Sequence, residues 1–328
     1  MMVKEDKVWG VAVCIWWTFL GCVMLVGMGL WGLHETTAAQ GATPTVPAIS
    51  RAINAAPMAC EDGLQESGAT YRICMPASWN GKLLVYAHGY VAPTEPIGIP
   101  EDQLGVAGSP TVDQLANALG FAFVTSGYRA NGLVVQEAIN DLIDAVNIFA
   151  DQEGAPSQVL LAGVSEGGLI TALAVERHPD VFDGGLAMCG PYGNFRDQIN
   201  YFGDFRVIFD YFFPNVMPPT AVAIPATLLD TWETSYYTQT VYPVITDTVN
   251  ITGVNRLLNV TAAPFDTDDP ATKVETIEDL LWYNVFATND ATVQLGGQPF
   301  DNRTRTYSGS ADDEALNQAV ARYDADAD

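Results

Sequence analysis

The amino-acid sequence predicts an α/β protein with a doubly wound, mostly parallel sheet, and three observations lead to this class. Apolar runs typical of buried strands alternate with segments of helical periodicity between residues 57 and 190. One of these runs passes into a helix through a glycine-rich turn at residues 163–168. The chain has 328 residues, of which 48% are hydrophobic, so it can bury a sizeable core. The strands are expected at residues 70–74, 83–87, 121–125, 159–162 and 185–189.

Three helices are expected between these strands. Ser109 and Pro110 supply a cap and a first-turn proline for a helix that stops at Gly120. Residues 133–153 carry apolar side chains at helical spacing, and Gly154 ends this segment. The third helix, residues 166–178, follows the glycine-rich turn. Because helices alternate with strands, they are expected to cover both faces of the sheet.

The alternation of strands and helices is lost after residue 190. Eight aromatic residues crowd the stretch 195–213, and segments with helical but no strand character follow. We expect residues 57–190 to form the first part of the core, residues 191–308 a helical lid inserted into it, and residues 309–328 the start of the return to the core. The aromatic stretch either forms an acyl-binding wall or a membrane-facing surface, or packs the lid on the sheet.

An uncharged apolar segment near the N-terminus predicts a transmembrane helix. Residues 8–33 contain no Asp, Glu, Lys or Arg, and as a helix they would span roughly 39 Å. Two lysines in residues 1–7 precede this segment, and no basic residue follows until Arg51, so residues 1–7 are expected in the cytoplasm. Residues 34–56 would then link the anchor to an extracytoplasmic domain. The alternative is a signal peptide that is cleaved, which would make the protein secreted.

The cysteines agree with export. Cys60 and Cys74 bracket a stretch whose glycine and polar content predicts a hairpin, and a disulfide between them would contribute about 3 kcal/mol in the chain-entropy model. Cys189 ends a predicted strand and is expected to be a core thiol.

The charge of the chain excludes one class of partner. The formal net charge is −25, from 39 acidic and 14 basic residues. Such a surface repels the phosphate backbone, so nucleic acid is not expected to bind.

The glycine-rich turn reads Gly163-Val164-Ser165-Glu166-Gly167-Gly168 and matches the pattern G-x-S-x-G between a strand and a helix. Glycine is needed on both sides of Ser165 because a Cβ there would collide with neighbouring backbone, while the serine hydroxyl projects from a strained turn. The N-terminus of the following helix offers N–H groups and a positive dipole end to a developing oxyanion. The alternative is an ordinary glycine-rich turn.

A second turn, His88-Gly89-Tyr90, directly follows the predicted strand 83–87. In a parallel sheet this turn would lie beside the first one. The N–H of Tyr90 could then join that of Glu166 in holding an oxyanion.

With these two turns in the order and context described, the chain resembles the α/β-hydrolase superfamily over residues 65–190. It is also similar, more loosely, to exported and lidded esterases and prolyl-oligopeptidase-like hydrolases around Phe300-Asp301-Asn302 and Tyr307-Ser308-Gly309-Ser310. The resemblance implies that Ser165 is the nucleophile, that Tyr90 and Glu166 donate to the oxyanion through their backbone N–H groups, and that His88 with Gly89 supports the oxyanion loop.

The resemblance also implies an activity: hydrolysis of a small carboxylic ester, with an apolar acyl or aromatic group, without a metal or organic cofactor. A serine peptidase of the prolyl-oligopeptidase type and a non-catalytic binding module on the same fold are the alternatives.

The family's triad runs Ser, then Asp or Glu, then His, and the histidines of this chain do not supply its last member. His34 lies at the predicted membrane boundary, His88 in the oxyanion turn and His178 at the far end of the helix after Ser165. We therefore expect the sequence to be truncated at its C-terminus, without the acid and the histidine. A degenerate hydrolase, or His88 as an unorthodox base, would explain the same observation. The 328-residue chain is expected to show negligible turnover.

Overall fold

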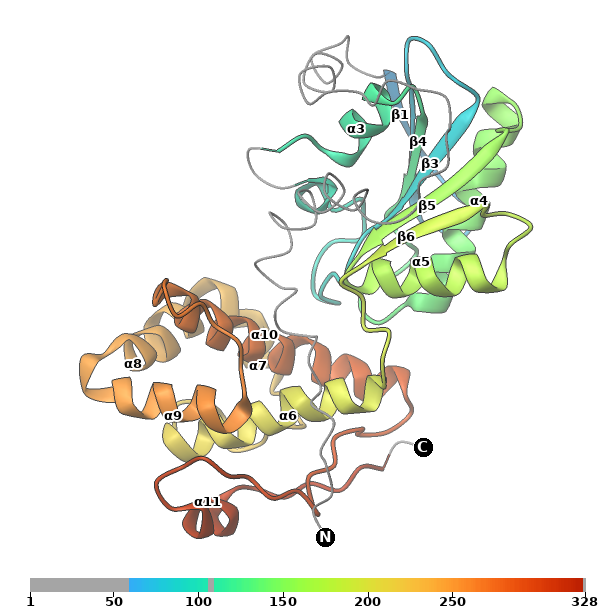
Figure 1. Ribbon diagram of the computed structural model, residues 1–328. Coiled ribbons are helices and arrows are strands. Elements are labelled where there is room, and N and C mark those ends of the chain that lie inside the picture. The colour runs from blue at the N-terminus through green and yellow to red at the C-terminus, as the bar shows by residue number, and fades with distance from the viewer. Residues whose placement is uncertain (1–58, 106–108, 327–328) are drawn as a thin grey trace, which may run out of the picture. The chain divides into compact units, whose positions relative to one another are not determined.

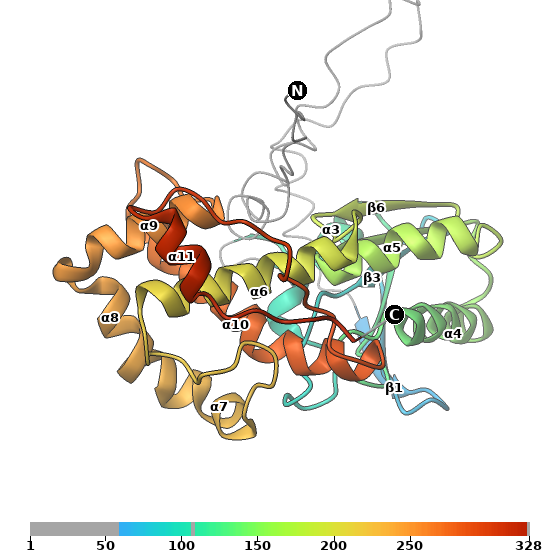
Figure 2. The ribbon, with the colours of Figure 1, turned by 90° about the horizontal axis from the view of Figure 1, so that it is seen from below.

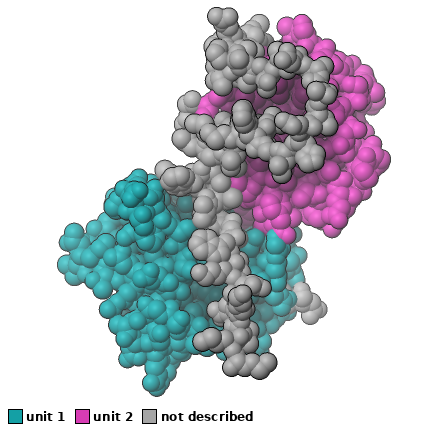
Figure 3. Space-filling model, in the orientation of Figure 1, with its two compact units in different colours: residues 1–14, 92–94, 193–328 teal, residues 15–91, 95–192 magenta. Residues whose placement is uncertain are grey.

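The computed structural model describes residues 59–105 and 109–326, which form two compact units (Figure 3). The sheet unit holds residues 59–91 and 95–192, and the helical unit holds residues 92–94 and 193–326.

The predicted cytoplasmic tip, anchor and linker, residues 1–56, lie outside the described residues. In the part of the chain that is described, no helix has both the length and the apolar character needed to cross a membrane.

The described residues of the sheet unit contain a six-stranded mixed sheet (Figure 1). Its order is β1-β2-β4-β3-β5-β6, in which β4, β3, β5 and β6 run parallel and β1 and β2 pair antiparallel at one edge. The five predicted strands are present, each within two residues of its expected bounds. The strands are β1 (Ala59–Leu64), β2 (Thr70–Met75), β3 (Lys82–Ala87), β4 (Ala122–Ser126), β5 (Gln158–Val164) and β6 (Gly184–Met188).

Helices cover both faces of this sheet, as the alternation in the sequence predicts. Helices α4 (Val135–Glu153) and α5 (Glu166–Arg177) pack on one face, where the side chains of Leu83 and Val85 from β3 join the larger core. Helix α3 (Val112–Ala118) packs on the opposite face with Leu84 and Tyr86 of the same strand. Because successive side chains of a strand point to opposite faces, the apolar run of β3 supplies both cores.

Helix α3 begins two residues later than the sequence pattern predicts. Its N-cap is Thr111, and the Gln114 side chain reaches back to accept the Thr111 N–H at 3.2 Å. This return bond needs a glutamine or glutamate three residues after the cap. Three residues after Ser109, the predicted cap, the chain has Val112, whose side chain cannot form this bond. The prediction that the helix starts at Pro110 is therefore wrong. The predicted end of α4 is confirmed, because Gly154 is its C-cap with a φ of +96°.

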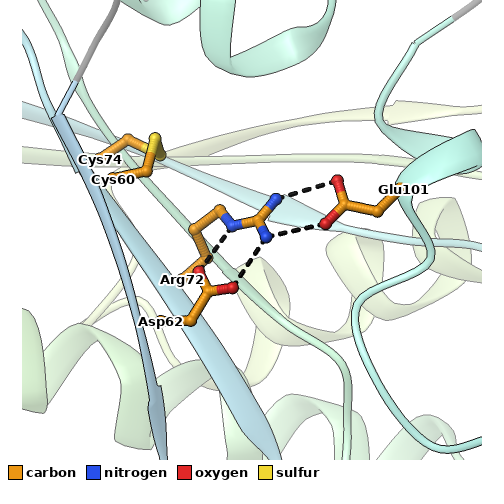
Figure 4. Close-up of a disulfide and its surroundings, with 5 residues drawn as sticks. All are labelled: Cys60, Asp62, Arg72, Cys74 and Glu101. Atoms are coloured by element: carbon orange, nitrogen blue, oxygen red, sulfur yellow. Dashed lines mark hydrogen bonds and ion pairs between the residues drawn. A yellow bond between two sulfur atoms is a disulfide. The ribbon is translucent and has the colours of Figure 1, made fainter.

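The hairpin predicted between Cys60 and Cys74 is present, and the two cysteines are joined by a disulfide (Figure 4). They lie directly opposite one another in the β1–β2 pair. On the same two strands, Arg72 donates to Asp62 at 2.7 Å and forms a second ion pair with Glu101 at 2.7 Å. Glu101 begins a short 3-10 helix, η1 (Glu101–Leu104), which is thereby held against β2.

The helical unit contains no strand among its described residues. Its elements are α6 (Phe195–Phe212), α7 (Ala226–Thr231), the π-helix η2 (Trp232–Val241), α8 (Tyr242–Thr246), the 3-10 helix η3 (Thr248–Asn250), α9 (Ile251–Thr261), α10 (Ala271–Gln294) and α11 (Asp313–Ala319). The long helices α6 and α10 lie side by side (Figures 1 and 2). Phe205 and Phe209, from the aromatic stretch of the sequence, are fully buried in α6, so this part of the stretch packs the helical unit.

Residues 309–326 belong to the helical unit, whereas the sequence led us to expect them in the returning core. Buried polar contacts hold the segment from Phe300 onward on α6. The Tyr307 hydroxyl donates to Asp204 at 2.6 Å, and Arg305 pairs with the other oxygen of that carboxylate at 2.8 Å. Asn302, which is fully buried, accepts the Tyr323 N–H at 2.7 Å. Tyr307 and Arg305 lie about 100 residues after Asp204 in the chain, which is too far for a local sequence pattern to reveal that they contact it.

The helical unit is expected to become more stable as the pH falls from 8 to 4. Burial raises the pKa of Asp204 to about 6, and burial together with Glu278 and Glu275 raises the pKa of Asp279 to about 7. A carboxyl whose folded pKa exceeds its unfolded value contributes stability that is present below the unfolded pKa and lost as the pH rises through the folded pKa. For Asp204 alone the difference corresponds to about 3 kcal/mol at most.

Hydrogen exchange of α6 and α10 in the whole protein would measure this change. The pKa of Asp301, lowered to about 2 by Arg303, acts in the opposite direction only below pH about 4. Asp204→Asn and Asp279→Asn should each flatten the profile between pH 4 and 8. Protection that instead increases toward pH 8 would contradict the expectation.

Candidate active site

Ser165 is the single residue between strand β5 and helix α5. β5 ends at Val164, α5 begins at Glu166, and Ser165 has φ 58° and ψ −124°. A positive φ is rare for a residue with a side chain and costs on the order of 1–3 kcal/mol, so it persists only where the surroundings impose it. The N–H of Ser165 donates to the Met188 carbonyl of the neighbouring strand at 3.0 Å, and its carbonyl accepts the Gly168 N–H at 2.9 Å. The serine is therefore held at a strained bend by its own backbone.

The glycines around Ser165 allow this bend because other backbone passes where a side chain would stand. A Cβ on Gly163 would lie 2.1 Å from the Gly167 carbonyl oxygen, and one on Gly167 would lie 2.0 Å from the Ala87 carbonyl oxygen. A Cβ on Gly168 would lie 2.5 Å from the Met188 carbonyl oxygen. Real contacts of this kind are not closer than about 3 Å. The steric requirement read from the sequence is thus present in the structure, and it extends to the third glycine.

The turn after β3 lies against this bend. β3 and β5 are parallel neighbours with Ala87 opposite Gly163, so the residues that follow each strand emerge at the same edge of the sheet. A Cβ built on Gly89 would lie 3.3 Å from the Cβ of Ser165. The structure therefore brings the two predicted turns together, with the backbone of Gly89 next to the serine.

His88 is a buried, neutral support for this turn. Burial lowers the pKa of His88 to about 4. Its Nδ1 lies 2.8 Å from the Gly89 carbonyl oxygen, which can only accept, so Nδ1 carries the proton. The ring stacks on Tyr128 with centroids 3.8 Å apart. Its Nε2 makes no hydrogen bond to any described residue, and so none to the Ser165 hydroxyl. In this geometry His88 holds the loop and does not contact the nucleophile.

Glu166 has a buried side chain that links the bend to the next helix. Its Oε1 accepts the N–H of Val134, the N-cap of α4, at 3.1 Å. A carboxylate at the N-terminus of a helix interacts favourably with the helix dipole. The sequence pointed to Glu166 only for its backbone, and nothing in the local pattern indicated the role of its carboxylate.

Gln103 is a site residue that the sequence did not reveal. Its side-chain oxygen accepts the Gly89 N–H at 2.8 Å, and its side-chain nitrogen donates to the Tyr90 carbonyl at 3.1 Å. It comes from η1, a segment with no motif of its own, so no signal in the sequence could have singled it out.

Of the other two histidines, only His178 lies in the described structure, and it does not approach Ser165. His178 is the C-cap of α5, at the opposite end of the helix that Ser165 begins. His34 lies outside the described residues. Among the residues that the structure describes, no group of three His, Cys, Asp or Glu side chains is placed to hold a metal ion. Cys189 lies directly after β6 and is only partly buried, so the expectation that it is a core thiol is wrong.

Comparisons with known proteins agree with this arrangement. Residues 116–206 match the model of the prolyl oligopeptidase family, and this range contains Ser165, β5 and α5. No curated protein matches the chain significantly. With its sheet order and the strained serine between β5 and α5, the sheet unit has an α/β-hydrolase-like fold, and residues 116–206 within it and after it are similar to the prolyl oligopeptidase family.

Several solved structures are similar at low identity. The Pyrococcus furiosus esterase Pf2001 has a TM-score of 0.35 and 15% identity, with 52% of this chain and 62% of that chain covered. The Pyrococcus horikoshii acylaminoacyl peptidase has a TM-score of 0.34 and 16% identity, with 47% and 25% covered. Brefeldin A esterase, a bacterial homologue of human hormone sensitive lipase, has a TM-score of 0.30 and 17% identity, with 54% and 59% covered. The chain thus spans less than two thirds of the length of each of these three structures.

Proposed function

We propose that this protein is a serine hydrolase that cleaves carboxylic esters through an acyl-enzyme at Ser165. The observation that carries the proposal is the strained Ser165 at the start of α5 with the Gly89 backbone beside it. Ser165 lies at the edge of the sheet and at the N-terminus of α5, where backbone N–H groups and the helix dipole can stabilise negative charge.

In the proposed reaction the Ser165 Oγ attacks the ester carbonyl carbon, and the N–H groups of Tyr90 and Glu166 stabilise the oxyanion of the tetrahedral intermediate. The carbon–oxygen bond to the alcohol then breaks, and the serine proton passes through a base to the leaving alkoxide. Water attacks the acyl-enzyme, which releases the carboxylic acid and restores the serine. We propose that the base is a histidine, oriented by an acid, and that it is not His88. The hydrogen bonding of His88 supports this, since its Nδ1 is bonded to the Gly89 carbonyl and its Nε2 makes no hydrogen bond to the Ser165 hydroxyl.

The substrate is proposed to carry an apolar acyl or aromatic group. Tyr192, which is 49% exposed, supports this: a Cβ on Gly168 would lie 2.7 Å from its hydroxyl oxygen, and a Cβ on Gly190 would lie 2.6 Å from its ring. Gly168 lies in the first turn of α5, and Gly190 packs against the backbone of Leu169 in the same turn, so the Tyr192 side chain is held near Ser165.

A serine peptidase of the prolyl-oligopeptidase type is the second candidate function. The match of residues 116–206 to that family favours it, and the bend at Ser165 serves acyl transfer from an amide as well as from an ester.

We further propose that the catalytic part is extracytoplasmic, anchored through residues 8–33 or secreted after cleavage. The disulfide between Cys60 and Cys74 supports export, because such bonds persist in oxidising compartments.

A fluorophosphonate probe followed by substrate profiling tests the proposed function in the full-length protein. We expect stoichiometric labelling at Ser165, turnover of short-chain p-nitrophenyl esters, and little turnover of peptide p-nitroanilides. Preference for the anilides would favour the peptidase, and absence of labelling would favour a binding module. For residues 34–328 alone we expect negligible ester turnover, because no described base contacts Ser165.

A further inference from the structure

The side chain of Gln103 contacts the oxyanion turn at two backbone groups. Its Oε1 accepts the Gly89 N–H at 2.8 Å, and its Nε2 donates to the Tyr90 carbonyl at 3.1 Å. Between these two groups along the chain lies the peptide unit made of the Gly89 carbonyl and the Tyr90 N–H. The His88 Nδ1–H donates to that Gly89 carbonyl at 2.8 Å.

These bonds determine the direction of the Tyr90 N–H. In a planar trans peptide the carbonyl and the N–H point in opposite directions, so the bond from His88 to the Gly89 carbonyl turns the Tyr90 N–H the other way. Gln103 holds the backbone groups before and after this unit, and rotation of the peptide would break one or both of its bonds. The Gly89 N–H donates to Gln103 and is therefore not offered to an oxyanion. In this turn, stabilisation of an oxyanion then depends on the direction of the Tyr90 N–H.

Gln103 is in turn held firmly by its surroundings. The Tyr86 hydroxyl donates to its backbone carbonyl at 2.8 Å, and its own N–H donates to Pro100 at 3.0 Å. The next residue, Leu104, is buried in the core between α3 and the sheet. Glu101, two residues earlier, is paired with Arg72 on the disulfide-linked hairpin (Figure 4).

We propose that Gln103 is a positioning residue that presets the Tyr90 N–H for the oxyanion, an inference that rests on the proposed hydrolase function. Stabilisation of an oxyanion is effective only when the donors are oriented before the reaction, since reorientation during the reaction costs part of the gain. The amide is suited to this task because it offers an acceptor and a donor at once. A carboxylate keeps only the acceptor, and a thioether offers neither in useful strength.

The rate constant for phosphonylation of Ser165, measured by intact mass spectrometry, tests this inference. In that reaction the serine oxygen bonds to phosphorus, fluoride leaves, and the serine proton goes to the solvent or to a base. The rate is measurable even without an efficient base, because oxyanion stabilisation persists when triad members are removed. We expect Gln103→Met to react roughly ten- to hundredfold more slowly, a smaller loss than the roughly 10²–10³ for removing an oxyanion donor itself.

Two further variants separate positioning from general destabilisation. Gln103→Glu keeps the acceptor for Gly89 but loses the donor to Tyr90, so its rate should fall between those of wild type and Gln103→Met. Gln152→Met makes the same change at an exposed glutamine of α4 whose side-chain nitrogen donates to the Tyr71 hydroxyl, and should react within about twofold of wild type. The melting temperature and the hydrogen exchange of residues 88–90 are recorded for each. Exchange of this turn should rise in the Gln103 variants only.

The outcomes distinguish this inference from the proposed function. Labelling of Ser165 in wild type with an unchanged rate in both Gln103 variants would overturn the role of Gln103 and leave the hydrolase proposal standing. Equal losses in Gln103→Glu and Gln103→Met, in proportion to a lower melting temperature, would also overturn it. If wild type is not labelled at Ser165, the hydrolase proposal fails and this inference falls with it. If Gln103→Met does not fold, Gln103→Glu carries the test, with an expected loss of roughly threefold or more.

Discussion

Replacement of Ser165 by alanine is expected to remove covalent labelling and to lower kcat for ester hydrolysis at least about a thousandfold in the full-length protein. The change deletes the hydroxyl that is proposed to form the acyl-enzyme and that lies at the strained position between β5 and α5. Folding should be retained, because the Cβ of alanine replaces that of serine and the backbone bonds of residue 165 remain. The measurement is the burst and steady-state release of p-nitrophenol from a short-chain ester.

The matched control is Ser157→Ala. Ser157 lies in the same unit just before β5, is exposed, and bonds to the Gly81 carbonyl at 2.9 Å. It should keep wild-type activity, because it is remote from the bend. Full activity of Ser165→Ala would show that the nucleophile lies elsewhere or that the reaction does not use one.

Gly167→Ala is expected to destabilise the sheet unit by about 3 kcal/mol or more and to abolish labelling of Ser165. The new Cβ would lie 2.0 Å from the Ala87 carbonyl oxygen and 2.6 Å from that of His88, and both are backbone atoms that cannot rotate away. Insertion of one methyl into a packed site costs typically about 1–3 kcal/mol, and a clash of the first turn of α5 with the backbone at the end of β3 lies at the upper end of that range or beyond. Urea unfolding followed by hydrogen exchange of β3 and β5 would measure the loss.

The control for this variant is Gly98→Ala in the same unit. A Cβ on Gly98 meets nothing within 4 Å, so its stability should stay within about 0.5 kcal/mol of wild type. If Gly167→Ala were as stable and as reactive as wild type, the close approach of strand β3 to the bend at Ser165 would be wrong.

The bend at Ser165 could be predicted from the sequence because its cause is local. A strand, a serine between glycines and a helix are contiguous, and the steric need for glycine at 163 and 167 follows from the tightness of the turn. The predicted strands have the same origin: each is a short apolar run, and the side-chain period of two places its residues in both cores. The hairpin of Cys60 and Cys74 was likewise visible as a polar, glycine-containing stretch between two cysteines.

The sequence by itself therefore determined which residues form the sheet unit, where the strained serine lies, and that a second turn would lie nearby. Only the tertiary structure decided how that turn is oriented. Gln103 reaches Gly89 across 14 residues, the Glu166 carboxylate reaches Val134 across 32, and Tyr307 reaches Asp204 across 103. Such contacts depend on how distant segments fold against each other, and a single polar side chain in a loop carries no periodicity that would indicate its partner.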